Sequence, residues 1–311
     1  MIKIEPLVSV IIPCYNVQNY IDECLQSVYA QTYPNIEIIC VDNNSTDQTL
    51  NILKRHSENG KVFVFQEFKK GASAARNMGL KKAKGKWIQF LDADDILLSN
   101  KISNQIRVVN KNEFTDVVVS PFIRRKINHK EFKVEICEDL RLGLLSSSLG
   151  ITSSNIFRSS QLKKLNGWKE DLASSQEYDL MFRLIKGRCN FITYNTALTI
   201  VRDRDIGQIS YSNPVKSWNQ YITLRLEIID YIKKNDPIYF KNNSIKIRQI
   251  LFDSLRILIK YDMVSALKIF NDQLIGFKPK KSNSTGWVYI IIYRFFGFQR
   301  TEKIRRVFKF N

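Results

Sequence analysis

Three carboxylates follow a short apolar run near residue 90. Residues 87–91 are predicted to form a buried strand, and Asp92, Asp94 and Asp95 come directly after it. Crowded carboxylates repel one another unless a cation lies among them, and Mg²⁺ or Mn²⁺ takes carboxylate oxygens while keeping positions for water and substrate phosphates. The spacing therefore predicts a seat for a metal ion and a diphosphate. The competing interpretation is a solvated acidic turn.

Composition narrows the chemistry further. The chain has two histidines and five cysteines among 311 residues, without a Cys-x-x-Cys pair. These counts disfavour a histidine-ligated metal site, a catalytic Ser-His pair, a zinc knuckle and a disulfide framework. Catalysis is expected to depend on carboxylates. The net charge of +18 attracts nucleic acid, anionic lipid or nucleotide phosphates, and does not choose among them.

Strands and helices are predicted to alternate along the first hundred residues, because continuous apolar runs alternate with stretches of helical spacing. The predicted strands are residues 8–13, 36–41, 62–66 and 87–91, and the predicted helices are residues 20–31, 45–55 and 73–84. A capping box over residues 45–48 is expected to open the second helix. The pattern predicts an α/β fold whose mainly parallel sheet is flanked by helices.

Three of these strands end in polar clusters, at residues 14–16, 42–44 and 92–94. In open parallel sheets, ligands bind beyond the carboxyl ends of the strands. The three clusters are therefore predicted to converge on one edge of the sheet and to form the ligand site there.

The second half of the chain begins with mixed elements and ends in helices. A helix is predicted at 101–110, a strand at 117–121, an antiparallel excursion over 123–136 and a helix at 177–186. From residue 215 the pattern is helical, so we expect one domain at 1–212 and a helical C-terminal extension at 213–311.

The end of the extension combines aromatic and basic residues. Residues 287–298 are mostly apolar and are followed by several lysines and arginines, which suits an anionic lipid interface. The alternative is a helix packed on the main domain. The first residues lack the long apolar stretch of a secretory signal. We therefore expect a cytoplasmic protein at the inner face of the plasma membrane.

Motifs in residues 8–16, 41–47, 71–77 and 91–95 resemble the inverting glycosyltransferase family 2, in family order and spacing. Residues 167–168 and 176–180 are similar to its acceptor-side motif, and beyond about residue 210 the resemblance gives nothing. The resemblance implies the GT-A fold, a Rossmann-like parallel sheet flanked by helices, here followed by a helical appendage. It also implies a metal-dependent hexosyltransferase.

The resemblance implies which residues hold the donor. Asp94 would ligate the Mn²⁺ or Mg²⁺ ion. A guanidinium suits diphosphate oxygens because it offers a planar fork of donors. Asn43 stands where many members have a second aspartate, which leaves the base of the nucleotide open. The implied nucleotide-binding residues are Pro13, Tyr15, Asn16, Asp42, Asn43, Arg76 and Asp92. The competing interpretations are loop packing for Tyr15 and a surface ion pair for Arg76.

The acceptor side needs a base, because inversion by single displacement removes a proton from the acceptor hydroxyl opposite the leaving group. The resemblance assigns this role to Glu177, with Asp171 as the reserve candidate. Trp168 and Asp179 are implied to bind the acceptor. The alternatives are a core tryptophan and an aspartate that orients its helix.

Three further residues have looser assignments. Asp95 is expected to cap the segment that follows it. Arg202 and Arg204 lie where relatives close a loop on the diphosphate, although the histidine often present in that loop is missing.

The predicted function is transfer of a hexose or N-acetylhexosamine, with inversion, from a nucleotide-diphospho-sugar to a glycan or lipid-linked glycan in cell-surface polysaccharide synthesis. A UDP-sugar is the first choice of donor. One alternative is a nucleotidyltransferase on a similar sheet, although the loop at Gly71 lacks a lysine-bearing phosphate-loop signature. The other is a non-catalytic protein that binds polyanions, which the acidic clusters at the sheet edge disfavour.

Overall fold

The computed structural model of the chain describes residues 5–58, 60–203, 213–282 and 284–308. The strands are β1 (Val8–Cys14), β2 (Ile36–Asp42), β3 (Phe63–Gln66), β4 (Trp87–Phe90), β5 (Ile96–Leu97), β6 (Val117–Val119), β7 (Phe122–Arg125), β8 (Glu131–Val134), β9 (Ile156–Arg158), β10 (Phe191–Thr193) and β11 (Thr199–Arg202). The helices are α1 (Ile21–Tyr29), α2 (Thr49–Glu58), α3 (Ala72–Lys82), α4 (Lys101–Lys111), α5 (Leu140–Ser146), α6 (Ser159–Lys164), α7 (Gln176–Lys186), α8 (Pro214–Asn235), α9 (Pro237–Leu258), α10 (Met263–Gln273) and α11 (Trp287–Phe308).

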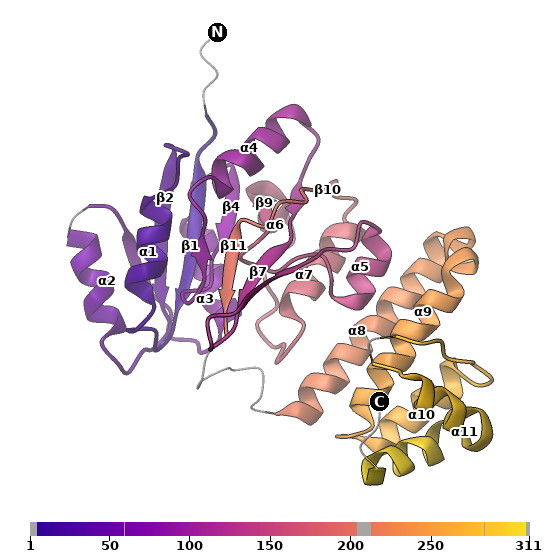
Figure 1. Cartoon of the computed structure of the whole chain (residues 1–311). Coiled ribbons are helices and arrows are strands. Elements are labelled where there is room, and N and C mark those ends of the chain that lie inside the picture. Colours follow the sequence, from indigo (N-terminus) through magenta and orange to yellow (C-terminus); the bar gives the residue numbers. More distant parts are fainter. Residues whose placement is uncertain (1–4, 59, 204–212, 283, 309–311) are drawn as a thin grey trace. The chain divides into compact units, whose positions relative to one another are not determined.

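The chain divides into two compact units. One consists of Met1–Leu172 and Gln176–Gly207, and the other of Ala173–Ser175 and Gln208–Asn311. The first unit contains all the strands listed above, and the second contains α8 to α11 (Figure 1). The predicted boundary at residue 212 lies close to this division but inside residues that the structure does not describe.

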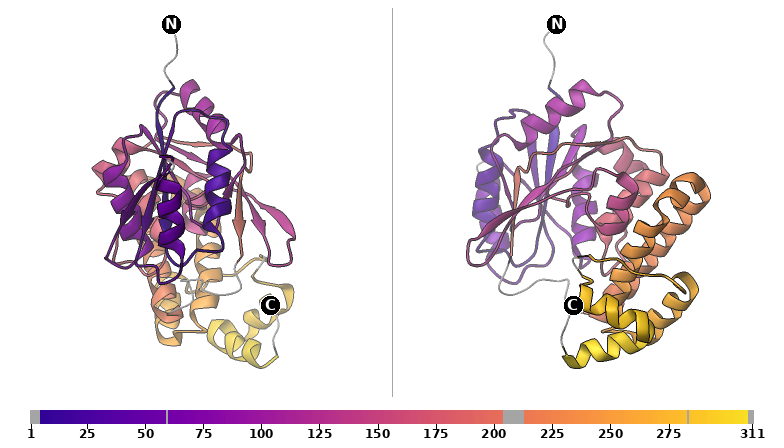
Figure 2. Two further views of the ribbon diagram at one scale, coloured as in Figure 1. Left: turned by 90° about the vertical axis from the view of Figure 1, so that its left-hand side faces the viewer. Right: turned by 45° about the vertical axis from the view of Figure 1, so that its right-hand side comes forward.

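The first unit is built on a seven-stranded sheet in the order β10-β6-β9-β4-β1-β2-β3. β1 pairs in parallel with β2 and with β4, and β9 is antiparallel to both of its neighbours. Helices cover both faces of the sheet (Figure 2). The predicted mainly parallel sheet is therefore confirmed, and its architecture is GT-A-like.

The register of the central strands brings the predicted ligand edge together. Cys14 of β1 is opposite Asp42 of β2, and Ile11 of β1 is opposite Phe90 of β4. The turn that follows β4 therefore lies beside the carboxyl ends of β1 and β2. This is the edge at which the sequence predicts the three polar clusters to converge.

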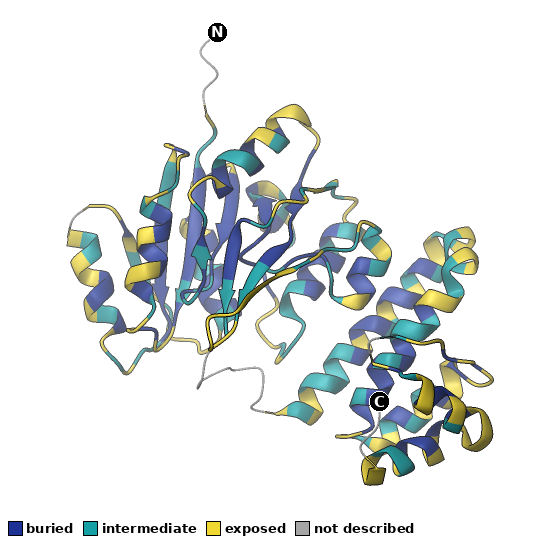
Figure 3. Ribbon diagram, viewed as in Figure 1, coloured by how far each residue is buried: buried dark blue, intermediate teal, exposed yellow. Residues whose placement is uncertain are grey.

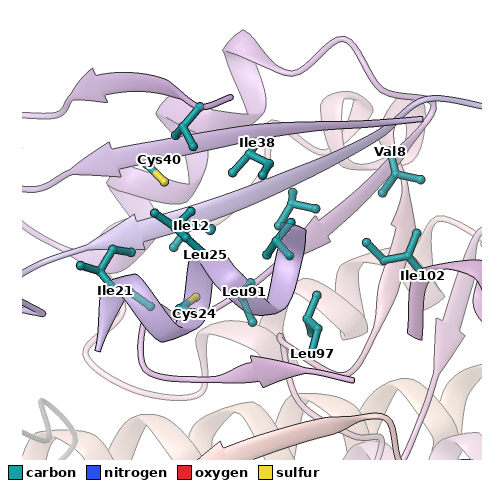
Figure 4. Packing of buried hydrophobic residues seen from close by; sticks show 14 of the residues in the cluster. Val8, Ile12, Ile21, Cys24, Leu25, Ile38, Cys40, Leu91, Leu97 and Ile102 are labelled. Atoms are coloured by element: carbon teal, nitrogen blue, oxygen red, sulfur yellow. The ribbon is translucent and has the colours of Figure 1, made fainter. Parts of the chain in front are cut away.

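Both faces of the sheet are tightly packed near this edge. Side chains of β1 that alternate along the strand, such as Val8 and Ile12, meet α1 and α4 in one apolar cluster (Figure 4). On the opposite face, Ile11 meets α3 at Gly79, where an added Cβ would lie 2.3 Å from the Cγ2 atom of Ile11. Since α3 carries Arg76, this close approach fixes the distance of Arg76 from the sheet.

A smaller sheet in the order β5-β11-β7-β8 lies beyond the acidic turn. β7 and β8 form an antiparallel pair where the sequence predicts an antiparallel excursion. β5 follows the acidic turn directly and pairs with β11, which ends at Arg202. The C-terminal end of β11 is thereby brought to the acidic turn.

One local prediction is wrong. The capping box over residues 45–48 does not open α2, which begins at Thr49. The Thr49 N–H donates to Oδ1 of Asp47 at 2.9 Å, whereas the Ser45 hydroxyl accepts the N–H of Asn16 at 3.2 Å. The structure uses this segment to join two loops at the ligand edge, and that long-range contact outweighs the local capping pattern.

The second unit is helical, as expected for the C-terminal extension. Phe252 of α9 lies at its centre, with ring-centroid distances of 5.5–6.4 Å to aromatic rings of α10, α11 and the segment between them. Within the described ranges, none of the helices combines the length and the apolar character needed to cross a lipid bilayer.

Candidate active site

The acidic turn after β4 is organised by Ser153, which lies three residues before β9. The Ser153 hydroxyl donates to Oδ2 of Asp95 at 2.6 Å. The Oγ atom of Ser153 also accepts a hydrogen bond from the Asp92 N–H at 3.1 Å. Asp95 is 2% exposed. Burial raises the pKa of Asp95 well above its ordinary value, and the neighbouring charges of Asp94 and Asp92 raise it further. Asp95 therefore anchors the turn from inside.

Arg76, which is predicted to bind the diphosphate, forms an ion pair with Asp92 in this structure. Nη2 of Arg76 lies 2.7 Å from Oδ1 of Asp92. The guanidinium of Arg76 also lies 4.7 Å from the ring centroid of Trp168, in cation–π contact. Its buried Nε has no hydrogen-bond partner in the part of the chain that the structure describes. A buried guanidinium with a donor still to satisfy suits a phosphate oxygen.

Trp168 is only 3% exposed. Its ring meets the ring of Phe90 edge-on at 5.2 Å, and its backbone is held on both sides by Asn77, at 2.8 and 2.9 Å. The structure thus gives Trp168 a packing role beneath Arg76. The contact of Trp168 with an acceptor sugar stays a prediction.

Glu177 lies in the first turn of α7, as predicted, and is half-buried. The Thr152 hydroxyl donates to Oε1 of Glu177 at 3.1 Å. Burial, and after it the charge of Asp92, raise the pKa of Glu177 to about 7, while the hydrogen bond from Thr152 and the charge of Arg76 act in the opposite direction. A carboxyl group with a pKa near neutrality can exchange protons at physiological pH, as a general base requires.

The other acidic candidates differ from Glu177 in their surroundings. Asp179 is buried, with Oδ1 2.9 Å from Nζ of Lys169 and Oδ2 2.7 Å from Nε of Arg183. Both of its oxygens are in ion pairs, so its predicted contact with the acceptor stays a prediction. Asp171, the reserve base, is exposed to solvent.

The ends of β1 and β2 form the predicted nucleotide side. Asp42 is 2% exposed, and its Oδ1 has no hydrogen-bond partner among the described residues. Oδ1 of Asn16 accepts the Thr46 N–H at 2.8 Å, which ties the loop after β1 to the loop after β2. Tyr15 is 44% exposed and Pro13 is partly exposed, so both are accessible to a ligand. Their roles in nucleotide binding stay predictions.

Asn43 has a role that sequence reasoning missed. Its Nδ2 donates to the carbonyl oxygens of Glu67 and Lys69 at 2.7 and 2.8 Å, and its Oδ1 accepts the Gly71 N–H at 2.7 Å. Every donor and acceptor of the amide therefore shapes the glycine loop that leads into α3. An aspartate could not make these two donations, which explains the asparagine at this position. Its predicted role in nucleotide binding stays a prediction.

Arg202 also contacts the acidic turn. Its Nε donates to the carbonyl oxygen of Asp94, its Nη1 pairs with Glu23 of α1, and its guanidinium lies 5.2 Å from the ring centroid of Tyr20. Arg202 thus holds the backbone from which the Asp94 carboxylate projects. Arg204 lies outside the described residues.

The described residues include no group of three or more histidine, cysteine, aspartate or glutamate side chains that could hold a metal ion by themselves. Mg²⁺ and related ions are often held by one or two carboxylates together with substrate phosphates and water. The carboxylates of Asp92 and Asp94, beside a buried guanidinium, fit an ion that arrives with a diphosphate.

Comparisons with known proteins agree with this geometry. The family model described as glycosyl transferase family 2 matches residues 9–168. An uncharacterized glycosyltransferase of Rickettsia typhi is 35% identical over 250 residues, which cover 77% of this chain and 77% of that protein.

Two more matches concern proteins with named substrates. The Escherichia coli UDP-Glc:alpha-D-GlcNAc-diphosphoundecaprenol beta-1,3-glucosyltransferase WfaP is 46% identical over 100 residues, which cover 32% of this chain and 40% of WfaP. The crystal structure of S. aureus TarS 1-349 in complex with UDP-GlcNAc has a TM-score of 0.64 and 22% identity, covering 86% of this chain and 76% of TarS 1-349. The structural likeness supports the GT-A fold.

Proposed function

Because the chain belongs to glycosyl transferase family 2, we propose that it transfers a hexose or N-acetylhexosamine from a nucleotide-diphospho-sugar to a glycan acceptor, with inversion of configuration. One observation carries the proposal: Glu177, a carboxyl group with a pKa of about 7, lies close enough to the Asp92–Arg76 pair to sense both charges. A base beside a diphosphate seat is the arrangement that single displacement needs. The family assignment leaves the nucleotidyltransferase and polyanion-binding alternatives without support.

The donor is proposed to bind along the edge formed by β1, β2 and the acidic turn. Arg76 would exchange part of its pairing with Asp92 for diphosphate oxygens, since its Nε is buried and unsatisfied within the described residues. Asp42, with a buried and unsatisfied Oδ1, would accept a hydrogen bond from the base or ribose. A UDP-sugar is our first choice because WfaP takes UDP-Glc and the TarS structure contains UDP-GlcNAc.

A Mn²⁺ or Mg²⁺ ion is proposed to bind with the donor, through Asp94 and the diphosphate. When bound there, such an ion would supply positive charge to offset the charge that develops on the departing nucleoside diphosphate. The chain's own contribution is to hold the Asp94 carboxylate in place, and the Arg202 contact with the Asp94 carbonyl supports that role.

Glu177 is proposed to remove the proton from the acceptor hydroxyl as the glycosidic bond forms. The proton moves to the Glu177 carboxylate while the bonding electrons of the old sugar–phosphate bond leave with the nucleoside diphosphate. Because its pKa is about 7, Glu177 is ionised in about half of the molecules at neutral pH. The same pKa lets its carboxylate accept the proton of the acceptor hydroxyl more readily than an ordinary glutamate would.

The acceptor is proposed to be a lipid-linked glycan at the cytoplasmic face of the membrane. The support is the printed activity of WfaP, which acts on a sugar attached to diphosphoundecaprenol. The aromatic and basic end of the chain is consistent with peripheral membrane contact, and no nucleic-acid partner is proposed.

The test combines donor hydrolysis with two matched variants. The chain is incubated with UDP-glucose, UDP-GlcNAc or GDP-mannose and Mn²⁺, and release of nucleoside diphosphate is measured with and without a diphosphoprenyl-linked sugar. Glu177→Gln should lower acceptor-dependent release by about 10²–10⁴-fold, whereas Asp171→Asn should leave it near the wild-type rate.

Three outcomes would contradict parts of the proposal. Release that survives Glu177→Gln but not Asp171→Asn would move the base to Asp171. A product whose anomeric configuration matches the donor by NMR would exclude inversion. Failure of every nucleotide sugar to bind would remove the proposed donor altogether.

A further inference from the structure

One face of helix α11 packs against the interior of the unit that contains α8 to α11. Tyr289 and Tyr293 lie 6.0 and 5.5 Å from the ring of Phe252. Further along, the helix is broken at Gly297, whose backbone angles are not helical, so the buried ion pair between Glu302 and Arg256, at 3.0 Å, holds only the part of α11 beyond Gly297. The packing of Tyr289 and Tyr293 on Phe252 therefore sets which face of residues 287–296 is presented to solvent.

That opposite face is apolar in its first half. Trp287, Ile291 and Phe295 follow one another at intervals of four residues, with Val288 alongside, and their exposed fractions are 60%, 54%, 78% and 55%. Residues four apart lie on the same side of a helix. These four side chains, which we call the α11 stripe, are apolar, exposed to solvent and on one side of the helix. Exposed and buried stretches alternate along the ribbon of the C-terminal helices (Figure 3).

Positive charge flanks the α11 stripe in the chain. Arg294 lies seven residues after Trp287 and so on the same side of the helix, and it is exposed. Lys280 and Lys281 precede the stripe, Arg300 and Lys303 follow it, and all four are exposed. The only acidic residue of α11 is the buried Glu302. Over residues 208–311 the chain has 19 lysines and arginines against 7 acidic residues.

This combination favours one occupant. A second copy of the same face would bring like charges together, which costs free energy. An anionic bilayer offers an apolar layer beneath negative headgroups, and helices with aromatic residues on one face and basic residues beside it lie in that interface.

We propose that the α11 stripe is a membrane-docking surface. Trp287, Val288, Ile291 and Phe295 insert at the boundary between headgroups and acyl chains, and the flanking lysines and arginines contact anionic headgroups. This inference deepens the proposed function, since it names the surface that would bring the enzyme to a lipid-linked acceptor. It can be tested without any sugar transfer, so its failure and the failure of the transferase proposal are distinguishable.

The test measures binding of the full chain to vesicles by co-sedimentation. Vesicles of phosphatidylcholine alone are compared with vesicles that also contain phosphatidylglycerol. Trp287→Ser with Phe295→Ser should reduce binding to the anionic vesicles by roughly 100-fold, because each immersed side chain contributes about a factor of ten. Arg300→Gln with Lys303→Gln should reduce it by about 25-fold, at about fivefold per charge.

A matched control uses other exposed apolar residues of the same unit. Val264 and Ile275 are 78% and 75% exposed but lie outside α11, so Val264→Ser with Ile275→Ser should bind like the wild type. Circular dichroism and melting temperature check that every variant is folded. Donor hydrolysis, which needs no membrane, should be the same in the stripe variant as in the wild type.

Several results would overturn the proposal. These are equal binding to neutral and anionic vesicles, equal binding by the stripe and control variants, or no binding by the wild type. A dimer in solution that the stripe variant abolishes, without vesicle binding, would assign the face to a second copy of the chain instead.

Discussion

Removal of the Thr152 hydroxyl should shift the acid limb of the pH–rate profile to higher pH. Thr152 donates to Oε1 of Glu177 at 3.1 Å, and this hydrogen bond favours the ionised form of the carboxyl group. Thr152→Val keeps the shape of the side chain and removes the donor. The pKa of Glu177, now about 7, should therefore rise.

The size of the shift follows from the hydrogen bond. A hydrogen bond to a charged group contributes about 1.5–3 kcal/mol, and a half-buried site takes the lower end, which corresponds to about one pKa unit. A base acts only when deprotonated, so activity is lost as the pH falls through the pKa. At pH 7 the ionised fraction should drop from about a half to about a tenth, and kcat/KM by about fivefold, with recovery near pH 9.

The assay is the acceptor-dependent release of nucleoside diphosphate between pH 5.5 and 9.5, in about half-unit steps. Thr152→Ser retains the hydroxyl and should reproduce the wild-type profile. A Thr152→Val profile that overlays the wild type, or moves to lower pH, would refute the reasoning. A uniform loss of rate at every pH would mean that Thr152 supports the fold of the site and not the ionisation of Glu177.

The remaining predictions concern the donor seat and the core beneath it. Asp94→Asn should abolish the rise in melting temperature that Mn²⁺ adds to UDP binding, and an unchanged rise would exclude Asp94 as a ligand. Arg76→Lys should raise KM for the donor by about tenfold or more, because lysine lacks both the planar fork and the stacking on the indole ring; equal kinetics would argue against a diphosphate contact. Arg202→Gln should weaken Mn²⁺-dependent binding more than binding of the nucleotide alone, since it acts through the Asp94 backbone. Gly79→Ala should destabilise the fold by about 1–3 kcal/mol in denaturant unfolding, because the new Cβ would meet the Cγ2 atom of Ile11 at 2.3 Å; a neutral effect would mean that α3 can move away from the sheet.

The elements that carry the site were predictable because their signals are local. The apolar runs of β1, β2 and β4, the acidic residues after β4 and the helical spacing after Glu177 each lie within about ten consecutive residues, where burial and periodicity act directly on the backbone. The position of the ligand edge followed, since the carboxyl ends of neighbouring parallel strands meet on one side. The helical character of the C-terminal extension was predictable for the same reason.

Other features depend on contacts between residues far apart in the chain, and no local pattern carries them. Ser153 reaches back 58 residues to Asp95, and Arg202 reaches back 108 residues to Asp94. The amide of Asn43 contacts backbone groups 24–28 residues away, and no pattern in the sequence around Asn43 indicates these contacts. A hydrogen bond of this kind depends on which loops the fold brings together, which the spacing of residue types does not encode.

The C-terminal helix illustrates both sides of this division. Its sequence alone determined that aromatic and basic residues are concentrated in residues 287–308, and it allowed either a packed helix or a lipid-facing one. Tertiary structure decided that Tyr289 and Tyr293 of α11 pack on Phe252 of α9, which leaves Trp287, Ile291 and Phe295 on the exposed face; contact of that face with lipid stays a proposal. Composition is a property of the chain, whereas the face a side chain presents depends on what packs against it.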